Sequence, residues 1–110
     1  MTLAEFERQV FEVAMASSIC SIPVVRRLTL TSINLRLSVA TGGFIDAFYN
    51  EQTHTMAYAL IVRGRRAFGA DNTGDWHVHP FDDPERHDPL PAAMSFGEFV
   101  AEIERQVARS

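Results

Sequence analysis

Two histidines separated by one residue are the clearest candidates for chemistry in this sequence. His77 and His79 lie in the run Trp76-His77-Val78-His79-Pro80. On an extended backbone, residues two positions apart project from the same face, so both imidazoles would face one side, and Trp76 and Val78 the other. Pro80 favours this geometry because a residue that precedes proline is biased away from helix. The pattern therefore predicts a short extended segment with an anchored face and a histidine face.

Paired imidazoles are suited to acid–base catalysis, because they titrate near neutral pH and one can accept a proton while the other donates one. Cleavage of an RNA phosphodiester needs a base for the 2′-hydroxyl and an acid for the leaving oxygen. It also needs cationic donors for the charge that develops on the phosphoryl group. The arginines of the turn Arg63-Gly64-Arg65-Arg66 could supply that charge. One interpretation is therefore a metal-independent endoribonuclease whose catalytic pair is His77 and His79.

Two other interpretations of the same histidines stay open. His77 and His79 could hold a divalent metal ion together with Asp71, Asp75 or His87. They could also be solvated surface groups on a segment that is anchored by its other face. The interpretation that we adopt, catalysis without metal, requires no cofactor.

Further polar and aromatic residues are candidates for the same site. Asp46 interrupts an apolar run, and a carboxylate buried there would need a partner or a function. Asp71 and Asn72 end a run of strand character, where functional side chains are common, although shaping a turn is the alternative. Tyr49 and Tyr58 could stack on bases or simply pack within strands. We assign catalysis to His77, His79, Asp71 and Asp46, and substrate contacts to Arg63, Arg65, Arg66, Tyr49, Asn50, Asn72 and Trp76.

The elements that must position these residues follow from periodicity. The capping box Thr2-Leu3-Ala4-Glu5 opens an amphipathic helix that ends near residue 17, and Ser95-Phe96-Gly97-Glu98 opens a second helix. Between them, strands are expected over 33–39, 44–49, 55–62 and 67–70, with 26–31 undecided, 76–79 as a short extended piece and 81–91 as an irregular loop. The connections are too short for crossover helices. The expected fold is a single α+β domain over residues 1–110, an antiparallel meander sheet of four to five strands flanked by an N-terminal and a C-terminal helix.

Composition excludes several classes of protein. The chain has 110 residues, of which 46% are hydrophobic and 22% charged, values of a globular domain and not of a disordered chain. Cys20 is the single cysteine, so no intramolecular disulfide can form. The apolar run 13–25 follows an acidic stretch where a signal peptide would be basic, and no run approaches the length of a membrane span. A cytoplasmic protein without membrane contact is expected.

Charge is distributed unevenly along the chain. All ten basic residues are arginine, and the net charge is −4. Residues 24–70 carry six arginines and two acidic residues, whereas residues 71–110 carry three arginines and nine acidic residues. This asymmetry favours a basic sheet surface that could bind RNA.

Three strings of this sequence resemble a known family. They are Phe44-Ile45-Asp46-Ala47-Phe48-Tyr49-Asn50-Glu51, Tyr58-Ala59-Leu60-Ile61-Val62-Arg63-Gly64-Arg65-Arg66-Ala67-Phe68-Gly69, and Asp71-Asn72 leading to Trp76-His77-Val78-His79-Pro80-Phe81. Together they resemble the TumE family of small toxins from prokaryotic toxin–antitoxin systems, over about residues 35–81. The positions that match the motif are Asp46, Tyr49, Asn50, Asp71, Asn72, Trp76, His77, His79 and Pro80.

The resemblance implies a toxin that a helix-turn-helix antitoxin protein, encoded beside it, binds and neutralises. It transfers no defined catalytic residue. One departure concerns Asp75, which stands where the family pattern has glycine before the tryptophan. If that glycine has a positive φ angle, Asp75 would strain the loop. A small sheet with free edge strands also suggests a homodimer.

Overall fold

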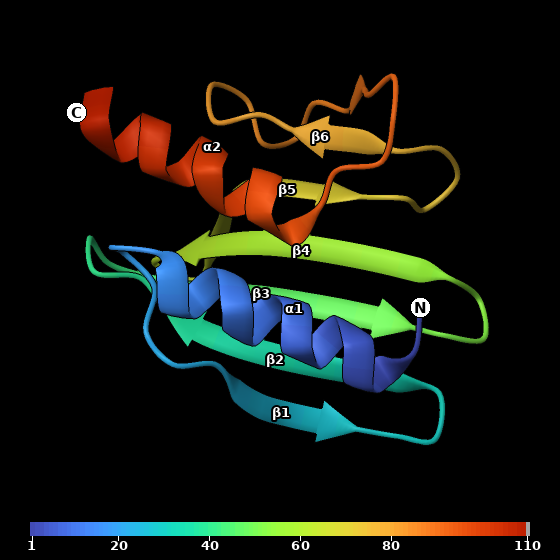
Figure 1. Ribbon diagram of the computed structural model, residues 1–110. Coiled ribbons are helices and arrows are strands. Elements are labelled where there is room, and N and C mark those ends of the chain that lie inside the picture. Colours follow the sequence, from blue (N-terminus) through green and yellow to red (C-terminus); the bar gives the residue numbers. More distant parts are fainter. Residues whose placement is uncertain (110) are drawn as a thin grey trace.

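The computed structural model describes residues 1–109 and consists of two helices and one sheet (Figure 1). In chain order the elements are α1 (Leu3–Ala16), β1 (Val24–Leu28), β2 (Ser32–Ser38), β3 (Phe44–Asn50), β4 (Thr55–Val62), β5 (Arg65–Asp71), β6 (His77–His79), β7 (Asp88–Pro89) and α2 (Phe96–Arg109). Both predicted capping boxes form: Thr2 with Glu5 begins α1, and Ser95 with Glu98 begins α2. The α+β class is therefore confirmed.

The seven strands form one antiparallel meander in which the order across the sheet equals the order along the chain. The expected four to five strands are an undercount. β6 and β7 have three and two residues, too few to show a two-residue period, and β7 lies where an irregular loop was expected. The sequence leaves the segment 26–31 undecided; the structure has a separate strand there, β1, which begins two residues earlier and ends at Leu28. All residues of β1 are exposed, so no burial pattern marks it. Figure 1 shows β1 and β6 toward opposite edges of the sheet.

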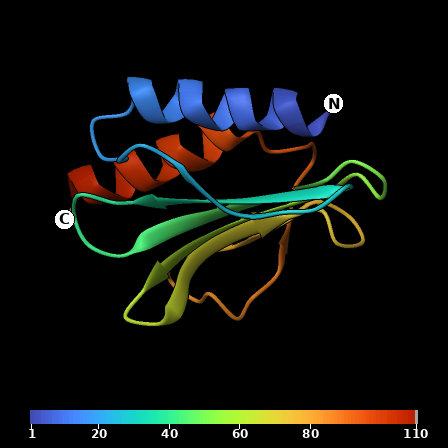
Figure 2. The same cartoon turned by 90° about the horizontal axis from the view of Figure 1, so that it is seen from below.

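Both helices pack on one face of the sheet, as Figure 2 shows. The alternate residues of β2 and β3 that point at the helices are buried, and their neighbours are partly exposed. The core joins both helices to the sheet and consists of Phe6, Val10, Ala14, Ile33, Leu35, Leu37, Val39, Ile45, Ala47, Tyr49, Tyr58, Leu60, Phe68, Ala70, Phe96, Phe99, Val100 and Ile103. The opposite face of the sheet, here called the open face, carries the alternate side chains.

No helix within residues 1–109 is long and apolar enough to cross a membrane.

Candidate active site

The register of β5 against β6 brings the predicted site residues together on the open face. His77 lies opposite Asp71 and His79 lies opposite Gly69, so these side chains share one face. Val78 lies opposite the buried Ala70 and points at the core. The predicted separation into a histidine face and an anchored face is confirmed.

The carboxylate of Asp71 bridges the two histidines. His77 Nε2 lies 3.2 Å from Asp71 Oδ1, and His79 Nε2 lies 3.1 Å from Oδ2. The backbone N–H of Thr73 also donates to Oδ1, at 3.0 Å. His77 Nδ1 donates to the backbone carbonyl of Asp75 at 2.9 Å, because a carbonyl oxygen can only accept.

The surroundings lower the pKa of both Asp71 and His79. Burial raises the pKa of Asp71, but the hydrogen bonds from Thr73 and His79 and the charge of His77 outweigh it, so the net pKa is lowered. Burial lowers the pKa of His79, and the hydrogen bond to Asp71 opposes this only in part. His79 is 3% exposed, and its Nδ1 has no hydrogen-bond partner in the described chain. The lowered pKa values of both groups favour an ionised Asp71 beside a neutral His79.

His87 joins the cluster from the β6–β7 loop, residues 80–87. Its ring stacks on that of His77, with centroids 4.9 Å apart and planes 5° from parallel, and lies edge-on to His79 at 4.5 Å. One nitrogen from each of His77, His79 and His87 lies within 4.8 Å of the other two. His87 is exposed and makes no hydrogen bond within residues 1–109.

Contacts at three places fasten the loop that carries His87. Phe81 stacks on Phe68 in β5, with ring centroids 4.3 Å apart. Arg66 Nη2 donates to the carbonyl of Pro84 at 3.0 Å. Arg86 forms ion pairs within the loop region, with Asp82 and Asp88. The loop is therefore held against the end of the sheet, and His87 stays beside His77.

These side chains line an open recess of about 300 Å³, which we call the histidine recess; its lining residues are Arg66, Asp71, Thr73, His77, His79 and His87. Arg66 reaches it by lying over Gly69, whose missing side chain leaves room: a Cβ there would come within 2.9 Å of Arg66 Cδ and 3.3 Å of His79 Cδ2. The buried Nε of Arg66 has no hydrogen-bond partner among the described residues. A guanidinium thus lies beside three imidazoles and a carboxylate.

The other candidates for catalysis and charge stabilisation lie outside the recess. Asp46 forms an ion pair with Arg36 of the neighbouring strand, Oδ1 to Nε 3.0 Å. It lies in the row Asp46–Ala59–Gly69–His79, three strand spacings or about 14 Å from His79. Its predicted catalytic role does not fit this placement. Arg63 and Arg65 are exposed in the β4–β5 hairpin and do not line the recess.

Two of the predicted substrate contacts, Tyr49 and Trp76, pack inside the protein. Tyr49 is 2% exposed under α1, where its ring stacks on Phe6 and its hydroxyl donates to the carbonyl of Met1. A base could not stack on it, and Tyr58 is buried as well. Trp76 packs against Tyr58, with centroids 6.2 Å apart.

The asparagines hold the ends of strands. The Asn50 side-chain oxygen accepts from the backbone of Gln52 and Thr53, which closes the β3–β4 turn. The Asn72 side chain binds the backbone of Met56 and His54 and so ties the end of β5 to β4. For Asn72, these contacts favour the turn-shaping alternative.

Sequence reasoning treated His87 only as a metal ligand and gave Arg66 the same weight as its neighbours. The signal that separates Arg66 is Gly69 three residues later, on which its side chain lies. Nothing local marks His87, because its approach to His77 depends on the path of the loop. Asp75 is not strained: the left-handed residue of this loop is Gly74, with φ +76°.

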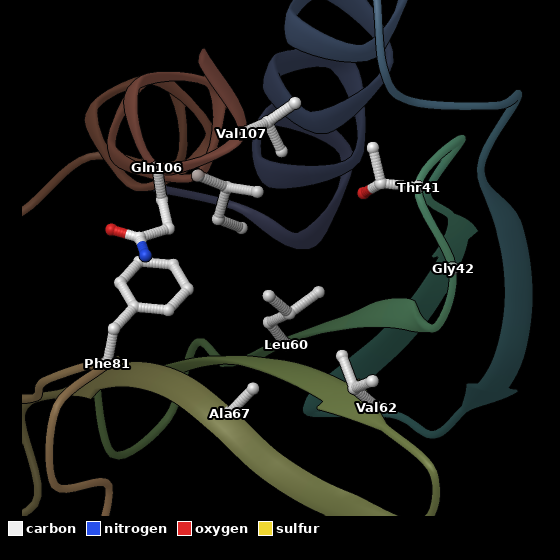
Figure 3. A pocket seen from close by; sticks show the side chains of 9 residues that line it. Thr41, Gly42, Leu60, Val62, Ala67, Phe81, Gln106 and Val107 are labelled. Atoms are coloured by element: carbon white, nitrogen blue, oxygen red, sulfur yellow. The ribbon is translucent and has the colours of Figure 1, made fainter. Parts of the chain in front are cut away.

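A larger recess of about 390 Å³ lies between α2 and the sheet (Figure 3). Its lining is mainly apolar, with Leu60, Val62 and Phe81 from the sheet side and Ile103 and Val107 from α2. Its lining has no histidine, carboxylate or cysteine to activate the Thr41 hydroxyl, so the histidine recess is the better candidate.

Comparison of the chain with protein-family models, with curated proteins and with solved structures gave no match. Inference about function therefore starts from the recess itself.

Proposed function

We propose that this chain is the toxin of a toxin–antitoxin pair and that it cleaves RNA at the histidine recess. The observation that carries the proposal is the convergence of His77, His79, His87, Asp71 and Arg66 on one open recess. Paired proton-transfer groups beside a guanidinium are what phosphodiester transesterification requires.

The burial of the three imidazoles suggests their division of labour. His79 is buried, with Nε2 on Asp71, so we assign it to positioning that carboxylate. We assign His77, whose Nε2 lies 3.2 Å from Asp71 Oδ1, as the general acid for the leaving oxygen. His87 is exposed and free of hydrogen bonds within residues 1–109, so it is the general base for the 2′-hydroxyl. The pair expected from sequence, His77 with His79, becomes His77 with His87.

Arg66 supports a phosphoryl group as the reacting centre. Its Nη2 donates to the carbonyl of Pro84, which fixes the guanidinium at the wall of the recess. A guanidinium fixed in this way can bind the non-bridging oxygens as charge develops on them. The TumE resemblance, whose motif includes Asp71, His77 and His79, supports the toxin role alone and assigns no chemistry to these residues.

Cleavage of a single-stranded RNA oligonucleotide in the presence of a chelator tests the proposal. The wild-type protein should cleave RNA, leave DNA of the same sequence intact, and produce 2′,3′-cyclic phosphate ends. His77→Ala and His87→Ala should each lower the rate by about 10²- to 10⁴-fold, the usual contribution of a general acid or base. His54→Asn is the matched control, because His54 lies outside the recess with φ +58°, which asparagine tolerates. Cleavage of DNA and RNA alike, or no loss in either alanine variant, would contradict this mechanism.

Induction of the chain in a bacterial host tests the toxin role. Growth arrest with RNA fragmentation is expected for the wild type, absent in the His77→Ala/His87→Ala double variant, and relieved when the neighbouring gene product is co-expressed. Arrest by the double variant with intact RNA would instead favour the alternative, a non-catalytic toxin that acts through unpaired arginines such as Arg63 and Arg65.

A further inference from the structure

We infer that His77, His79, His87 and Asp71 form a binding site for one divalent transition-metal ion of the zinc type. The site is argued from geometry alone and stands whether or not the chain cleaves RNA. Its effect on catalysis, argued last, rests on the function proposed above.

The donor atoms are gathered close to the separations that a metal site needs. Zinc binds imidazole nitrogen and carboxylate oxygen at about 2.0–2.2 Å, so neighbouring donors of a tetrahedral site lie about 3.3 Å apart. The Asp71 oxygens lie 3.2 and 3.1 Å from the Nε2 atoms of His77 and His79. The three imidazoles offer nitrogens within 4.8 Å of one another. The imidazole nitrogens must therefore approach one another by up to about 1.5 Å to share an ion. The Asp71 carboxylate beside two of them supplies the fourth ligand.

The surroundings of His77 match those of a metal ligand. Its Nδ1 donates to the Asp75 carbonyl, which fixes the ring and leaves Nε2 as the atom that faces the cluster. Metal-bound histidines commonly donate their other N–H to a backbone carbonyl or a carboxylate in this way. That nitrogen lies 3.2 Å from Asp71 Oδ1. A cation held between them would bind the nitrogen and the carboxylate together.

The chemistry of the donors selects the class of ion. Three neutral imidazoles and one carboxylate suit zinc and its neighbours in the first transition row, whereas magnesium and calcium require mainly oxygen ligands. Three ligands lie on or beside paired strands, and the fourth, His87, comes from an exposed loop. Ion binding should therefore also restrain the loop at residue 87.

The test is binding of Co²⁺ and Zn²⁺ to the full chain, purified without a polyhistidine tag. Wild-type protein should bind one Co²⁺ with visible absorption bands of a four-coordinate site, and Zn²⁺ should displace it. His87→Ala and Asp71→Asn should weaken binding by more than about tenfold, since loss of even an outer partner of a metal ligand costs about 10- to 100-fold. His54→Asn, outside the cluster, should bind as the wild type does. Circular dichroism of each variant shows whether it is folded.

Absence of a one-to-one complex in wild-type protein would overturn the inference. So would equal affinity in folded His87→Ala, because the ion would then be bound elsewhere. His87 lies on an exposed loop, so its removal is not expected to unfold the core.

The ion and proton transfer compete for the same nitrogens. Zn²⁺ bound at His77 and His87 removes the acid and the base, so it should inhibit RNA cleavage in proportion to occupancy. Binding together with inhibition supports both proposals. Binding with cleavage that requires the ion would keep the site and overturn the acid–base mechanism. Binding without cleavage under any condition would keep the site and overturn the proposed function.

Discussion

Gly69 determines whether the guanidinium reaches the histidine recess. It lies opposite His79, and Arg66 crosses its surface. In Gly69→Ala, the new Cβ would lie 2.9 Å from Arg66 Cδ and 3.3 Å from both His79 Cδ2 and the Tyr58 carbonyl. The side chain of Arg66 is the most easily displaced of these, so the variant should fold but lose its phosphate contact. Displacement of about 1 Å in an active site costs on the order of 10²-fold in rate, which RNA cleavage kinetics would measure.

Gly97→Ala is the control for that experiment. A Cβ at this position in α2 would lie 3.5 Å from Val13 Cγ2, which is an ordinary van der Waals distance. Neither residue lines the histidine recess. It should leave cleavage unchanged. Cleavage by Gly69→Ala at the wild-type rate would show that Arg66 does not act on the substrate.

For single residues, the sequence predicts those side-chain positions that follow from local backbone geometry. The shared face of His77 and His79 follows from two-residue alternation and is found, together with the inward face of Val78. The approach of His87 to His77 could not be predicted, because it depends on contacts of Phe81 and Arg66 that cross from the loop to β5. Long-range contacts of this kind leave no period in the sequence.

The beginning of α2 is stabilised by a charge-dependent cap. The Ser95 N–H donates to Glu98 Oε1 at 2.8 Å, and the Glu98 N–H donates to Ser95 Oγ at 3.1 Å. These bonds lower the pKa of Glu98 below its ordinary value, and the bond from the Ser95 backbone has the larger effect. A carboxyl group with a lowered pKa in the folded state stabilises the fold above its unfolded pKa, about 4.3. That stability is lost as pH falls through the folded pKa.

Glu98→Gln should therefore be less stable than the wild type near neutral pH, and the difference should shrink below about pH 4. Urea unfolding at a series of pH values measures it. Glu12→Gln, an exposed substitution in α1, is the matched control and should show a much smaller dependence. A difference between wild type and Glu98→Gln that is constant with pH would contradict a role for the ionised carboxylate.

The elements that sequence predicts best are those long enough to show a period. α1, α2 and β2 to β5 each span seven residues or more, and both capping boxes are visible as four-residue patterns. β6 pairs with the free edge of β5, and β7 pairs with β6, so both strands depend on tertiary contacts. β1 escapes prediction for another reason: it has no buried side, so hydrophobicity cannot mark it.

Across the whole molecule, the edge of the sheet at β1 differs from the edge at β6 and β7. The β6–β7 loop and the histidine recess lie at one edge of the sheet. At the other edge, β1 presents exposed apolar side chains. Val24 and Leu28 are 58% and 64% exposed, and Leu30, just beyond the strand, is 96% exposed. An exposed apolar edge strand is a ready site for pairing with another chain.

We expect two copies of the chain to pair through β1 and form one continuous sheet, as in other twofold dimers. Arg26 and Arg27 form no ion pair within residues 1–109, so pairing would bring like charges together. Salt screens such repulsion, so a higher salt concentration should strengthen the dimer. Sedimentation equilibrium at low and high salt measures this.

The double variant Val24→Lys/Leu28→Lys should be monomeric, because it adds charge to the same edge and removes apolar area from the interface. Met15→Lys, which changes an equally exposed apolar residue on α1, should dimerise as the wild type does. A wild type that stays monomeric at every concentration would contradict the dimer. If that monomer instead pairs with the antitoxin and the double variant does not, the edge serves the partner protein.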